Sequence, residues 1–353
     1  MNALRELQTQ AGASFADAGH PPLDFANAEI AWQAALNAVA VGDRSHWPLI
    51  AVKGEDRQQF LHNQTTNDIK ALQPGESCEA VFVNSTGRTL DLATIYATDD
   101  ALLVLSSPNP VQNLRDWLDR YLFPMDRVEL VDLSTEWVCL SLLGPASGAL
   151  LAEFGVKVEE WGDRQHSQVE LTDTTLRLAT GNGLGLAGYT LFVPAEQAAA
   201  VWALLKQAGA VPLGERVWQQ LRVRQGRPAV GHELLTDYNP LEAGLWRSIS
   251  FTKGCYIGQE TIARLNTYKG VKQRLWGVQL SAAAEPGTII MQAENKIGVL
   301  TSAIATPEGW LGLAYVKTKA AEAGSEIQVG EVEGKLVAAP YLTHEYYEPE
   351  KTI

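Results

Sequence analysis

The chain has 353 residues, of which 46% are hydrophobic and 20% are charged, and this predicts an ordinary globular protein of two or three domains. The 28 basic and 41 acidic side chains give a net charge of −13, which repels a phosphate backbone and argues against nucleic acid as a partner. No apolar run approaches the roughly 18–20 residues that span a bilayer, so we expect no membrane partner.

The cysteines Cys78, Cys139 and Cys255 are odd in number and far apart in the sequence. This usage is typical of a reducing compartment, and the N-terminus lacks the apolar core of a signal peptide, so we expect a cytoplasmic protein. No Cys-x-x-Cys or His-x-x-x-His pair occurs. We therefore expect no metal site built by this chain alone, while a cluster bridged between subunits by Cys255 stays open.

The first third of the chain predicts helices and strands after a flexible leader at 1–22, which is polar and closes with two prolines. The alanine-rich stretch 28–40 predicts a helix. Strands are predicted at 79–84, 90–97 and 102–107, followed by a helix at 111–122 whose leucine and aromatic residues fall on one face.

The middle third repeats this style. Strands are predicted at 137–142, 167–171, 174–180 and 188–193, with helices at 146–154 and 194–208. Tight turns join many neighbouring strands, which favours an α+β fold with mixed antiparallel sheets over a doubly wound parallel sheet. From Val271 onward, short strands separated by glycine-containing turns predict a small β-barrel.

These patterns divide the chain into four regions. We predict the leader at 1–22, an N-terminal α+β domain at 23–135, a middle α+β domain at 136–270 and a C-terminal β-barrel domain at 271–353. The sequence does not fix the boundary between the first two domains, which can also be intertwined.

A glycine-rich run at 183–188 matches the Gly-x-Gly-x-x-Gly pattern of dinucleotide-binding proteins. That mechanism needs a helix directly after the glycines, so that its N-terminal N–H groups meet a pyrophosphate. The sequence that follows, from Tyr189 to Val193, predicts a strand instead. We interpret the glycines as a hairpin turn.

The segment KGCYIGQE, residues 253–260, carries the most distinctive chemistry. Lys253 lies two positions before Cys255, and a nearby cation favours the reactive thiolate. Polar side chains follow where a helix is predicted to begin, namely Gln259, Glu260 and Arg264. The alternative is that Cys255 is a small buried apolar residue, as Cys78 and Cys139 are expected to be within their strands.

KGCYIGQE resembles the signature of the YgfZ-type folate-binding proteins, a branch of the family that includes the glycine-cleavage T-protein. Four further stretches resemble motifs of the same family, and the resemblance covers the chain from about residue 23. They are FLHNQTTND at 60–68, VNSTGRTLDLATIY at 83–96, NPLEAGLW at 239–246 and IGVLTSAIATPEGWLGLAYV at 297–316.

The resemblance implies a three-domain clover-leaf or ring around a channel that holds tetrahydrofolate. It implies Cys255 and Lys253 as the catalytic pair. The candidate folate-binding residues are Asn84, Asp91, Arg224, Glu233, Gln259 and Arg264. Two departures matter. Leu92 stands where the T-protein has a second acid. Arg224 stands where the family often has a pterin-binding glutamate, so either folate binds differently here or another group such as Asp91 or Glu233 replaces that glutamate.

Three functions compete. The first is a tetrahydrofolate-dependent accessory protein for iron–sulfur cluster assembly or repair, with iron–sulfur enzymes or assembly proteins as partners. The second is an aminomethyltransferase that moves a one-carbon unit from a lipoyl carrier to tetrahydrofolate. The third is a folate-binding scaffold without catalysis. The sequence leaves it uncertain whether the protein is an enzyme.

Overall fold

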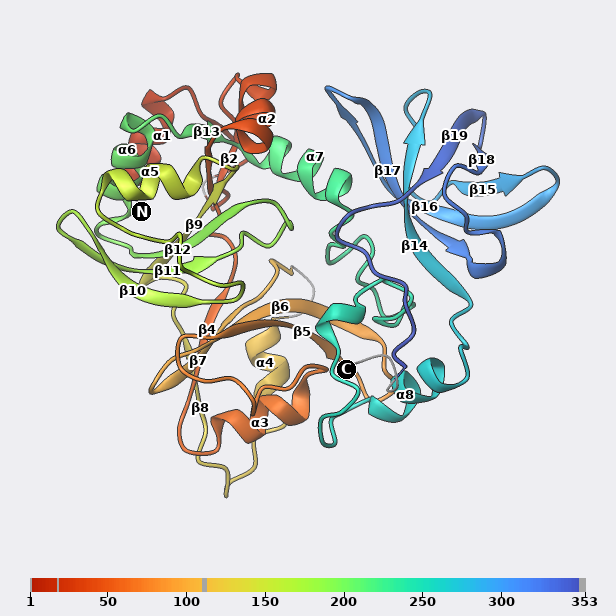
Figure 1. Cartoon of the computed structure of the whole chain (residues 1–353), viewed down its shortest axis with the longest axis horizontal. Coiled ribbons are helices and arrows are strands. Elements are labelled where there is room, and N and C mark those ends of the chain that lie inside the picture. Colours follow the sequence, from red (N-terminus) through yellow and green to blue (C-terminus); the bar gives the residue numbers. More distant parts are fainter. Residues whose placement is uncertain (1, 18, 110–112, 349–353) are drawn as a thin grey trace.

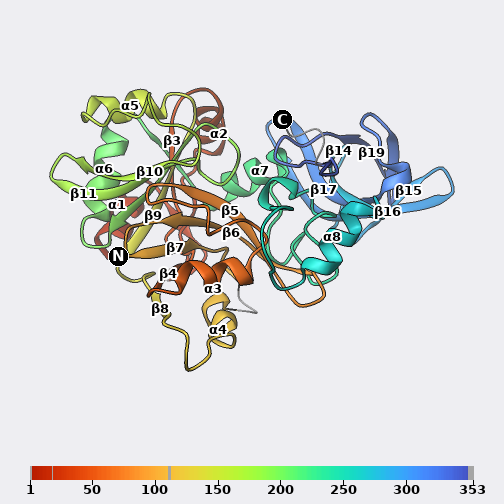
Figure 2. The same ribbon diagram turned by 60° about the horizontal axis from the view of Figure 1, so that its bottom comes forward.

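The computed structural model describes residues 2–17, 19–109 and 113–348. Figure 1 shows three units arranged around a common centre: two open sheets with their helices, and a separate barrel. In the turned view of Figure 2, the second sheet lies over the first, and the barrel stands beside both.

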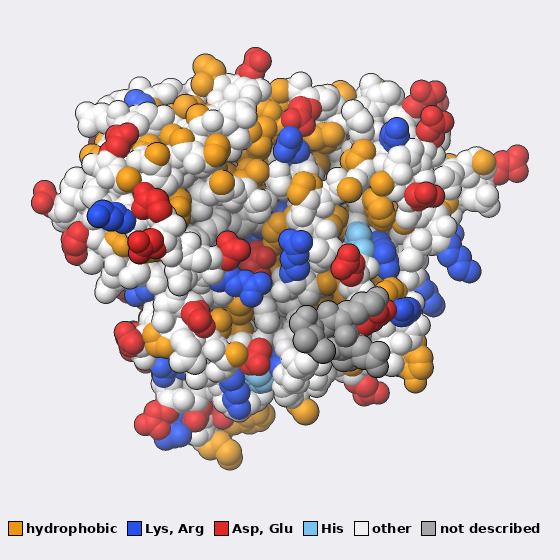
Figure 3. Space-filling model, in the orientation of Figure 1, with side chains coloured by type: hydrophobic (Ala, Val, Ile, Leu, Met, Phe, Trp, Pro, Cys, Tyr) orange, Lys and Arg blue, Asp and Glu red, His pale blue; other side chains and the backbone are white. Residues whose placement is uncertain are grey.

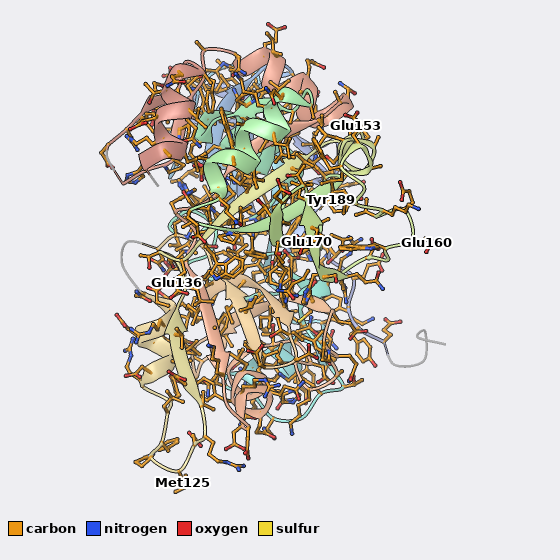
Figure 4. All side chains as sticks on the ribbon, turned by 90° about the vertical axis from the view of Figure 1, so that its left-hand side faces the viewer. Met125, Glu136, Glu153, Glu160, Glu170 and Tyr189 are labelled. Atoms are coloured by element: carbon orange, nitrogen blue, oxygen red, sulfur yellow. The ribbon has the colours of Figure 1, made fainter. Side chains whose placement is uncertain are left out.

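The first sheet has five antiparallel strands in the order β5-β6-β7-β4-β8. Their bounds are β4 Leu49–Lys53, β5 Ser77–Val83, β6 Thr89–Ala97, β7 Ala101–Leu105 and β8 Glu129–Asp132. Helices α3 (Arg57–Gln64) and α4 (Leu114–Asp119) contribute Leu61 and Leu118 to an apolar cluster with the strands. The loop between α4 and β8 projects away from the sheet, with Met125 at its tip (Figure 4).

The second sheet has six strands in the order β10-β11-β12-β9-β3-β13. Their bounds are β3 Ala40–Asp43, β9 Trp137–Leu143, β10 His166–Leu171, β11 Thr174–Thr180, β12 Gly188–Pro194 and β13 Val211–Leu213. The β3–β13 pair is parallel and the other pairs are antiparallel. The helices of this unit are α2 Ala28–Asn37, α5 Ser147–Glu153, α6 Ala198–Gln207 and α7 Glu215–Gln225.

The third unit is a closed barrel in the order β14-β17-β16-β15-β18-β19. Its strands are β14 Gln273–Leu280, β15 Ile289–Gln292, β16 Asn295–Thr306, β17 Gly309–Lys317, β18 Glu326–Val329 and β19 Val332–Val337. Helix α8, Gln259–Thr267, and the short helix η1, Trp246–Ser248, lie on the connection that leads into it, and η2, Thr318–Ala320, follows β17. The prediction of a C-terminal β-barrel is confirmed.

The N-terminal segment differs from the predicted flexible leader. Helix α1 spans Asn2–Gln10, and strands β1 (Ser14–Phe15) and β2 (Pro22–Asp24) pair with each other. Leu4 is buried in the core of the second unit, and buried Gln8 donates a hydrogen bond of 2.8 Å to Asp43. The prediction of a flexible leader is therefore wrong for this helix, because the buried Leu4 and Gln8 anchor it to the second unit despite its polar composition.

The first two units also divide differently from the predicted ranges. Residues 40–43 form a strand of the second sheet, where β3 lies between β9 and β13. The KGCYIGQE segment contacts the first unit, since Ile257 N donates to Asn63 O at 2.9 Å. The two sheets pack face to face through a cluster that includes Tyr96 and Phe192, whose rings lie 5.1 Å apart. The chain thus passes from the second unit to the first and back.

Most predicted elements occur within a few residues of their expected bounds. The glycine run 183–188 lies in the loop between antiparallel β11 and β12, so the hairpin interpretation is confirmed. The predicted helix at 111–122 is shorter, as α4 covers Leu114–Asp119 and residues 111–112 lie outside the described part. Among the described residues, the helices are all too short or too polar to cross a membrane.

Candidate functional site

A cavity of about 350 Å³, the central cavity, lies between the first two units and the segments that precede and follow the barrel. Strands β5 and β6 provide Glu79 and Tyr96, and the β11–β12 loop provides Asn182 and Gly183. The segments 244–248 and 340–341 complete the wall. Figure 3 shows that this face of the molecule is hollowed between the units and that basic side chains lie beside the hollow. The cavity volume falls within the range of small-ligand sites.

One wall of the central cavity holds a tyrosine and a carboxylate that are hydrogen-bonded to each other. The Tyr341 hydroxyl donates to Glu79 Oε1 at 2.6 Å, across 262 positions of the sequence. Burial raises the pKa of Tyr341 well above its ordinary value, so the phenol remains a donor at neutral pH. The hydrogen bond to Oε1 leaves Glu79 Oε2 available to accept from a ligand.

The rim of the central cavity is basic on two sides. Arg164 and Arg247 line the cavity and are exposed, and they come from the loop before β10 and from η1. Asp163 lies at the same rim and reduces the local positive charge. Exposed guanidinium groups at a cavity mouth favour ligands that carry a carboxylate outside the cavity.

A second cavity of about 180 Å³ has a wall of different residues. Its wall includes His46, Trp47, Ser107, Arg222 and Arg227. Burial lowers the pKa of His46 to about 2, so its imidazole is neutral at physiological pH. In the described structure His46 Nδ1 has no hydrogen-bond partner.

Asp91 lies next to this second cavity. Its Oδ2 accepts from Ser107 N at 3.1 Å and its Oδ1 accepts from Leu92 N at 2.7 Å. Burial raises the pKa of Asp91 to about 7, although the side chain of Ser107, these two backbone hydrogen bonds and the positive charge of Arg227 act in the opposite direction. A carboxyl group with a pKa near neutrality can take up or release a proton during a reaction.

Two predicted folate-binding residues occupy structural positions instead. Glu233 is fully buried and accepts from Arg222 and Ser302, at 2.8 and 2.6 Å. Its carboxylate therefore joins α7 to barrel strand β16. Arg224 Nε donates to Glu308 at 3.0 Å on the outer side of α7, and it lines neither cavity. Neither Glu233 nor Arg224 lines the central cavity, whose wall carries the carboxylates of Glu79 and Asp163.

Asn84 and the KGCYIGQE segment are brought together in the structure. Asn84 Oδ1 accepts from the backbone N–H groups of Thr86 and Arg88, both at 3.0 Å, and so stabilises the turn between β5 and β6. This turn contacts the start of α8 so closely that a Cβ on Gly258 would lie 2.6 Å from Asn84 O. Asn84 therefore positions the segment and lines neither cavity.

Lys253 is buried and its ammonium group holds two motifs together. Its Nζ donates to the carbonyl oxygens of His62, Thr65 and Asn67, at 2.6, 2.7 and 2.7 Å. Burial lowers the pKa of Lys253 to about 7. Three backbone acceptors match the three N–H donors of the ammonium form, and no hydrogen bond joins Lys253 to Cys255 in the described structure.

Cys255 is exposed, whereas Cys78 and Cys139 are buried and their pKa values are raised by burial to about 12. The interpretation of Cys255 as a small core residue is therefore wrong. Gln259 Nε2 donates to Gly254 O at 3.5 Å beside the thiol segment, and Arg264 is exposed in the last turn of α8. Neither lines the central cavity. Within the described residues, no group of His, Cys, Asp and Glu side chains is arranged to hold a metal ion.

Several residues of the two cavities carried no signal in the sequence. Glu79, Tyr341 and Arg227 come from three distant stretches, and only the fold brings them together. Arg164 and Arg247 look like ordinary surface cations until the cavity between them is known.

Comparison with known proteins agrees with this architecture. The family model of the GCVT N-terminal domain matches residues 4–253. The chain is 40% identical over 328 residues to At1g60990, a chloroplastic protein of Arabidopsis thaliana whose name gives transferase as its class but no substrate. That alignment covers 91% of this chain and 76% of the relative. An aminomethyltransferase of Synechococcus elongatus is 28% identical over 358 positions, which cover 98% of this chain and 95% of that enzyme.

Among solved structures, the glycine cleavage system aminomethyltransferase T of Bartonella henselae is similar with a TM-score of 0.84. The identity is 21%, and the match covers 98% of this chain and 99% of that one. The similarity shows the fold. The prediction of a T-protein-like α+β fold is confirmed.

Proposed function

The chain belongs to the family of the GCVT N-terminal domain, and from this premise we propose that its central cavity binds tetrahydrofolate or a derivative. The observation that supports this most directly is the pairing of Glu79 with Tyr341 inside a cavity whose mouth carries Arg164 and Arg247. A half-buried carboxylate and a basic rim suit a ligand with donors at one end and acids at the other.

Folate has this distribution of groups. The pyrimidine edge of its pterin carries adjacent N–H donors, which a carboxylate such as Glu79 accepts as a pair. The flat faces of the pterin are apolar and suit aromatic walls such as Tyr96 and Tyr341. The glutamate tail carries carboxylates, which Arg164 and Arg247 attract at the mouth.

We propose further that the protein is an accessory factor for iron–sulfur enzymes, that it acts in the cytoplasm, and that Cys255 is its working thiol. The support is the KGCYIGQE segment, whose cysteine is exposed on a loop held in place by Lys253 and by the Gly87–Gly258 contact. An exposed cysteine on a rigidly held loop is accessible to a partner protein. Iron–sulfur enzymes or their assembly proteins are the proposed partners.

An aminomethyltransferase is the second candidate. The relatives of that name match nearly the whole chain, and buried Asp91 with its pKa near 7 supplies a carboxyl group suited to proton transfer. The absence of a second acid at Leu92 weakens this candidate. Formation of methylene-tetrahydrofolate from an aminomethylated lipoyl carrier would establish it.

Two measurements test the proposal. Calorimetric titration of the purified protein with tetrahydrofolate is expected to give saturable binding, and no binding would overturn the folate assignment. Complementation of a host that lacks its own copy is expected to fail with Cys255→Ala and to succeed with Cys139→Ala, whose cysteine is buried. Equal rescue of iron–sulfur enzyme activity by both variants would contradict a working thiol.

A further inference from the structure

Arg227 is a buried cation that forms no salt bridge within the described part of the chain, although its positive charge acts on the carboxyl group of Asp91. Only 4% of the residue is exposed. Among the described residues, its one hydrogen bond runs from Nη1 to Pro228 O at 3.4 Å, and its Nε has no partner. The guanidinium lies 5.2 Å from the ring centre of Trp47 and 5.9 Å from that of Tyr341. These aromatic faces attract the cation but accept no hydrogen bond in the plane of the guanidinium group.

The neighbouring buried arginines are bound differently. Arg222 Nη1 lies 2.8 Å from Glu233, and Arg44 Nη2 lies 2.6 Å from Glu215. An unpaired buried charge destabilises a folded protein, so nearly all buried cations have an anionic partner or a ligand. Arg227 is thus the exception in a region where the two other buried guanidinium groups are neutralised.

Arg227 also lies between the two cavities. It lines the second cavity, while Gly183 and Tyr341, which it contacts, line the central cavity. A Cβ on Gly183 would lie 3.6 Å from Arg227 Nε and 3.9 Å from Nη2. Because Gly183 has no side chain, it leaves the edge of the guanidinium uncovered. His46 Nδ1, also without a partner among the described residues, belongs to a residue that lines the second cavity beside it.

We propose that Arg227 anchors the ligand of the central cavity by donating two N–H groups to a carbonyl or oxyanion group of the ligand. This rests on the proposed function, and it deepens it by naming the group that is recognised. In tetrahydrofolate this group is the 4-oxo oxygen of the pterin, whose two lone pairs accept both N–H groups, because the neighbouring ring nitrogens carry hydrogen. A carboxylate or phosphate group accepts the same two N–H groups.

The pterin is then held from two sides. Glu79 lines the central cavity and accepts from the donor edge of the pterin, whereas Arg227 lines the second cavity and donates to the 4-oxo oxygen past Gly183. The ligand therefore completes the pairing of Arg227 that the protein leaves open. It also brings the 4-oxo oxygen near Ser107 and the buried Asp91.

The test compares Arg227→Met, Arg227→Lys and the control Arg224→Met, whose arginine pairs with Glu308 outside both cavities. Loss of a charge-assisted pair of about 1.5–3 kcal/mol corresponds to roughly 10- to 100-fold weaker binding. We expect this loss in calorimetric titrations of Arg227→Met with tetrahydrofolate, a smaller loss for Arg227→Lys and none for Arg224→Met. Equal affinity of wild type and Arg227→Met would overturn the proposal.

Thermal unfolding without ligand separates binding from a structural role. Arg227→Met is expected to unfold at the wild-type temperature or above it, because the variant removes an unpaired buried charge. Arg222→Met is expected to unfold at a lower temperature, because it leaves Glu233 unpaired. An equal decrease for both variants would assign Arg227 to structure and contradict the proposal.

Inorganic phosphate distinguishes the two proposals if wild type does not bind tetrahydrofolate. The folate assignment then fails. A phosphate-dependent rise of the unfolding temperature in wild type, absent from Arg227→Met, would keep Arg227 as the anchor of a different oxyanion ligand. No rise, or the same rise in both proteins, would overturn the anchor as well.

Discussion

At the scale of single residues, Asp91 is the group whose protonation the fold controls most directly. Burial raises its pKa from 3.8 to about 7. The folded protein therefore holds the proton more tightly than the unfolded chain does. The contribution of Asp91 to the free energy of unfolding is therefore present at acidic pH and is lost as the pH rises from about 4 to about 7.

We predict that Asp91→Asn removes this pH dependence. Between pH 5 and pH 8, wild type should lose up to a few kcal/mol of unfolding free energy relative to the variant, in the sense given by proton linkage. Urea unfolding at both pH values measures the difference. A constant difference between the two proteins across this range would mean that Asp91 does not titrate there.

Lys253 is expected to contribute to stability through its three carbonyl partners. Lys253→Met leaves these buried acceptors without a donor, and we predict a loss of roughly 2–4 kcal/mol of unfolding free energy. Urea unfolding is the measurement, and Lys206→Met, at an exposed position of α6, is the control. Equal stability of the two variants would show that water molecules replace Lys253 as the donors to its three carbonyl partners.

The sequence located part of the site at this scale. It identified Cys255 and the motif around Asn84, because unusual residue types cluster there, and the structure places these two motifs against each other. It predicted ligand contacts for Arg224 and Glu233. In the structure Arg224 is hydrogen-bonded to Glu308, and Glu233 is hydrogen-bonded to Arg222. No pattern in the sequence singles out Arg227. A buried arginine cannot be distinguished from a surface arginine before its neighbours are known.

At the scale of elements, the contact between the β5–β6 turn and the start of α8 depends on two glycines. Gly258 has a φ of +77°, and a Cβ there would lie 2.9 Å from Gly87 Cα as well as close to Asn84 O. Backbone atoms cannot move aside as a flexible side chain can. This close approach explains why the thiol segment lies firmly on the first unit.

We predict that Gly258→Ala destabilises the protein more than Gly209→Ala does. Gly209 has a φ of +98° but open space around its Cβ position, so it controls for backbone strain alone. Strain of this kind costs roughly 1–2 kcal/mol, and the clash at Gly258 should add to it. Urea unfolding of both variants measures the difference. Equal losses would mean that the turn and α8 separate at little cost.

The C-terminal segment 341–348 fastens α8 from the other side. Asn266 of α8 exchanges two hydrogen bonds with the backbone of Tyr347, at 3.2 and 2.9 Å. The ring of Tyr347 stacks on Phe251 at 5.2 Å, and the ring of Tyr346 lies edge-on to Trp246 at 5.0 Å. The C-terminal segment therefore holds both α8 and the stretch with Trp246 and Phe251. These two stretches precede and follow the loop that carries Cys255.

Asn266→Ala should loosen this attachment locally. We predict faster amide hydrogen exchange in α8 and in residues 344–348, with unchanged exchange in barrel strands β16 and β17. Exchange followed by mass spectrometry resolves these segments. Asn37→Ala, which removes a hydrogen bond within α2, serves as the control. Unchanged exchange in α8 would show that the aromatic contacts suffice.

Elements with a regular pattern could be predicted, and those held by few contacts could not. Strands β6, β11 and β12 lie within one residue of the ranges that the sequence predicts, and the barrel strands are separated by the glycine-containing turns. The sequence of helix α1 is mostly polar outside Leu4 and Leu7, and such a composition predicts a flexible leader. The tertiary contact to α6 decides its structure, and no local pattern reports such a contact.

At the scale of the whole molecule, the first two units share the chain in a way that sequence ranges did not predict. Strand β3 reaches the second sheet before β4 begins the first, and the chain returns to the second sheet at β9. Parallel and antiparallel pairing over such distances leaves no local signal. The result is that the walls of the central cavity come from segments as distant as 77–79 and 340–341.

The central claim is that this cavity binds the pterin of a folate through Glu79. The most direct measurement is calorimetric titration of wild type, Glu79→Gln and Arg224→Glu with tetrahydrofolate. We predict roughly 10- to 100-fold weaker binding for Glu79→Gln, from the loss of a charge-assisted hydrogen bond, and wild-type affinity for Arg224→Glu, whose residue lies outside the cavity. Wild-type affinity in Glu79→Gln, or a change of affinity in Arg224→Glu alone, would contradict the claim.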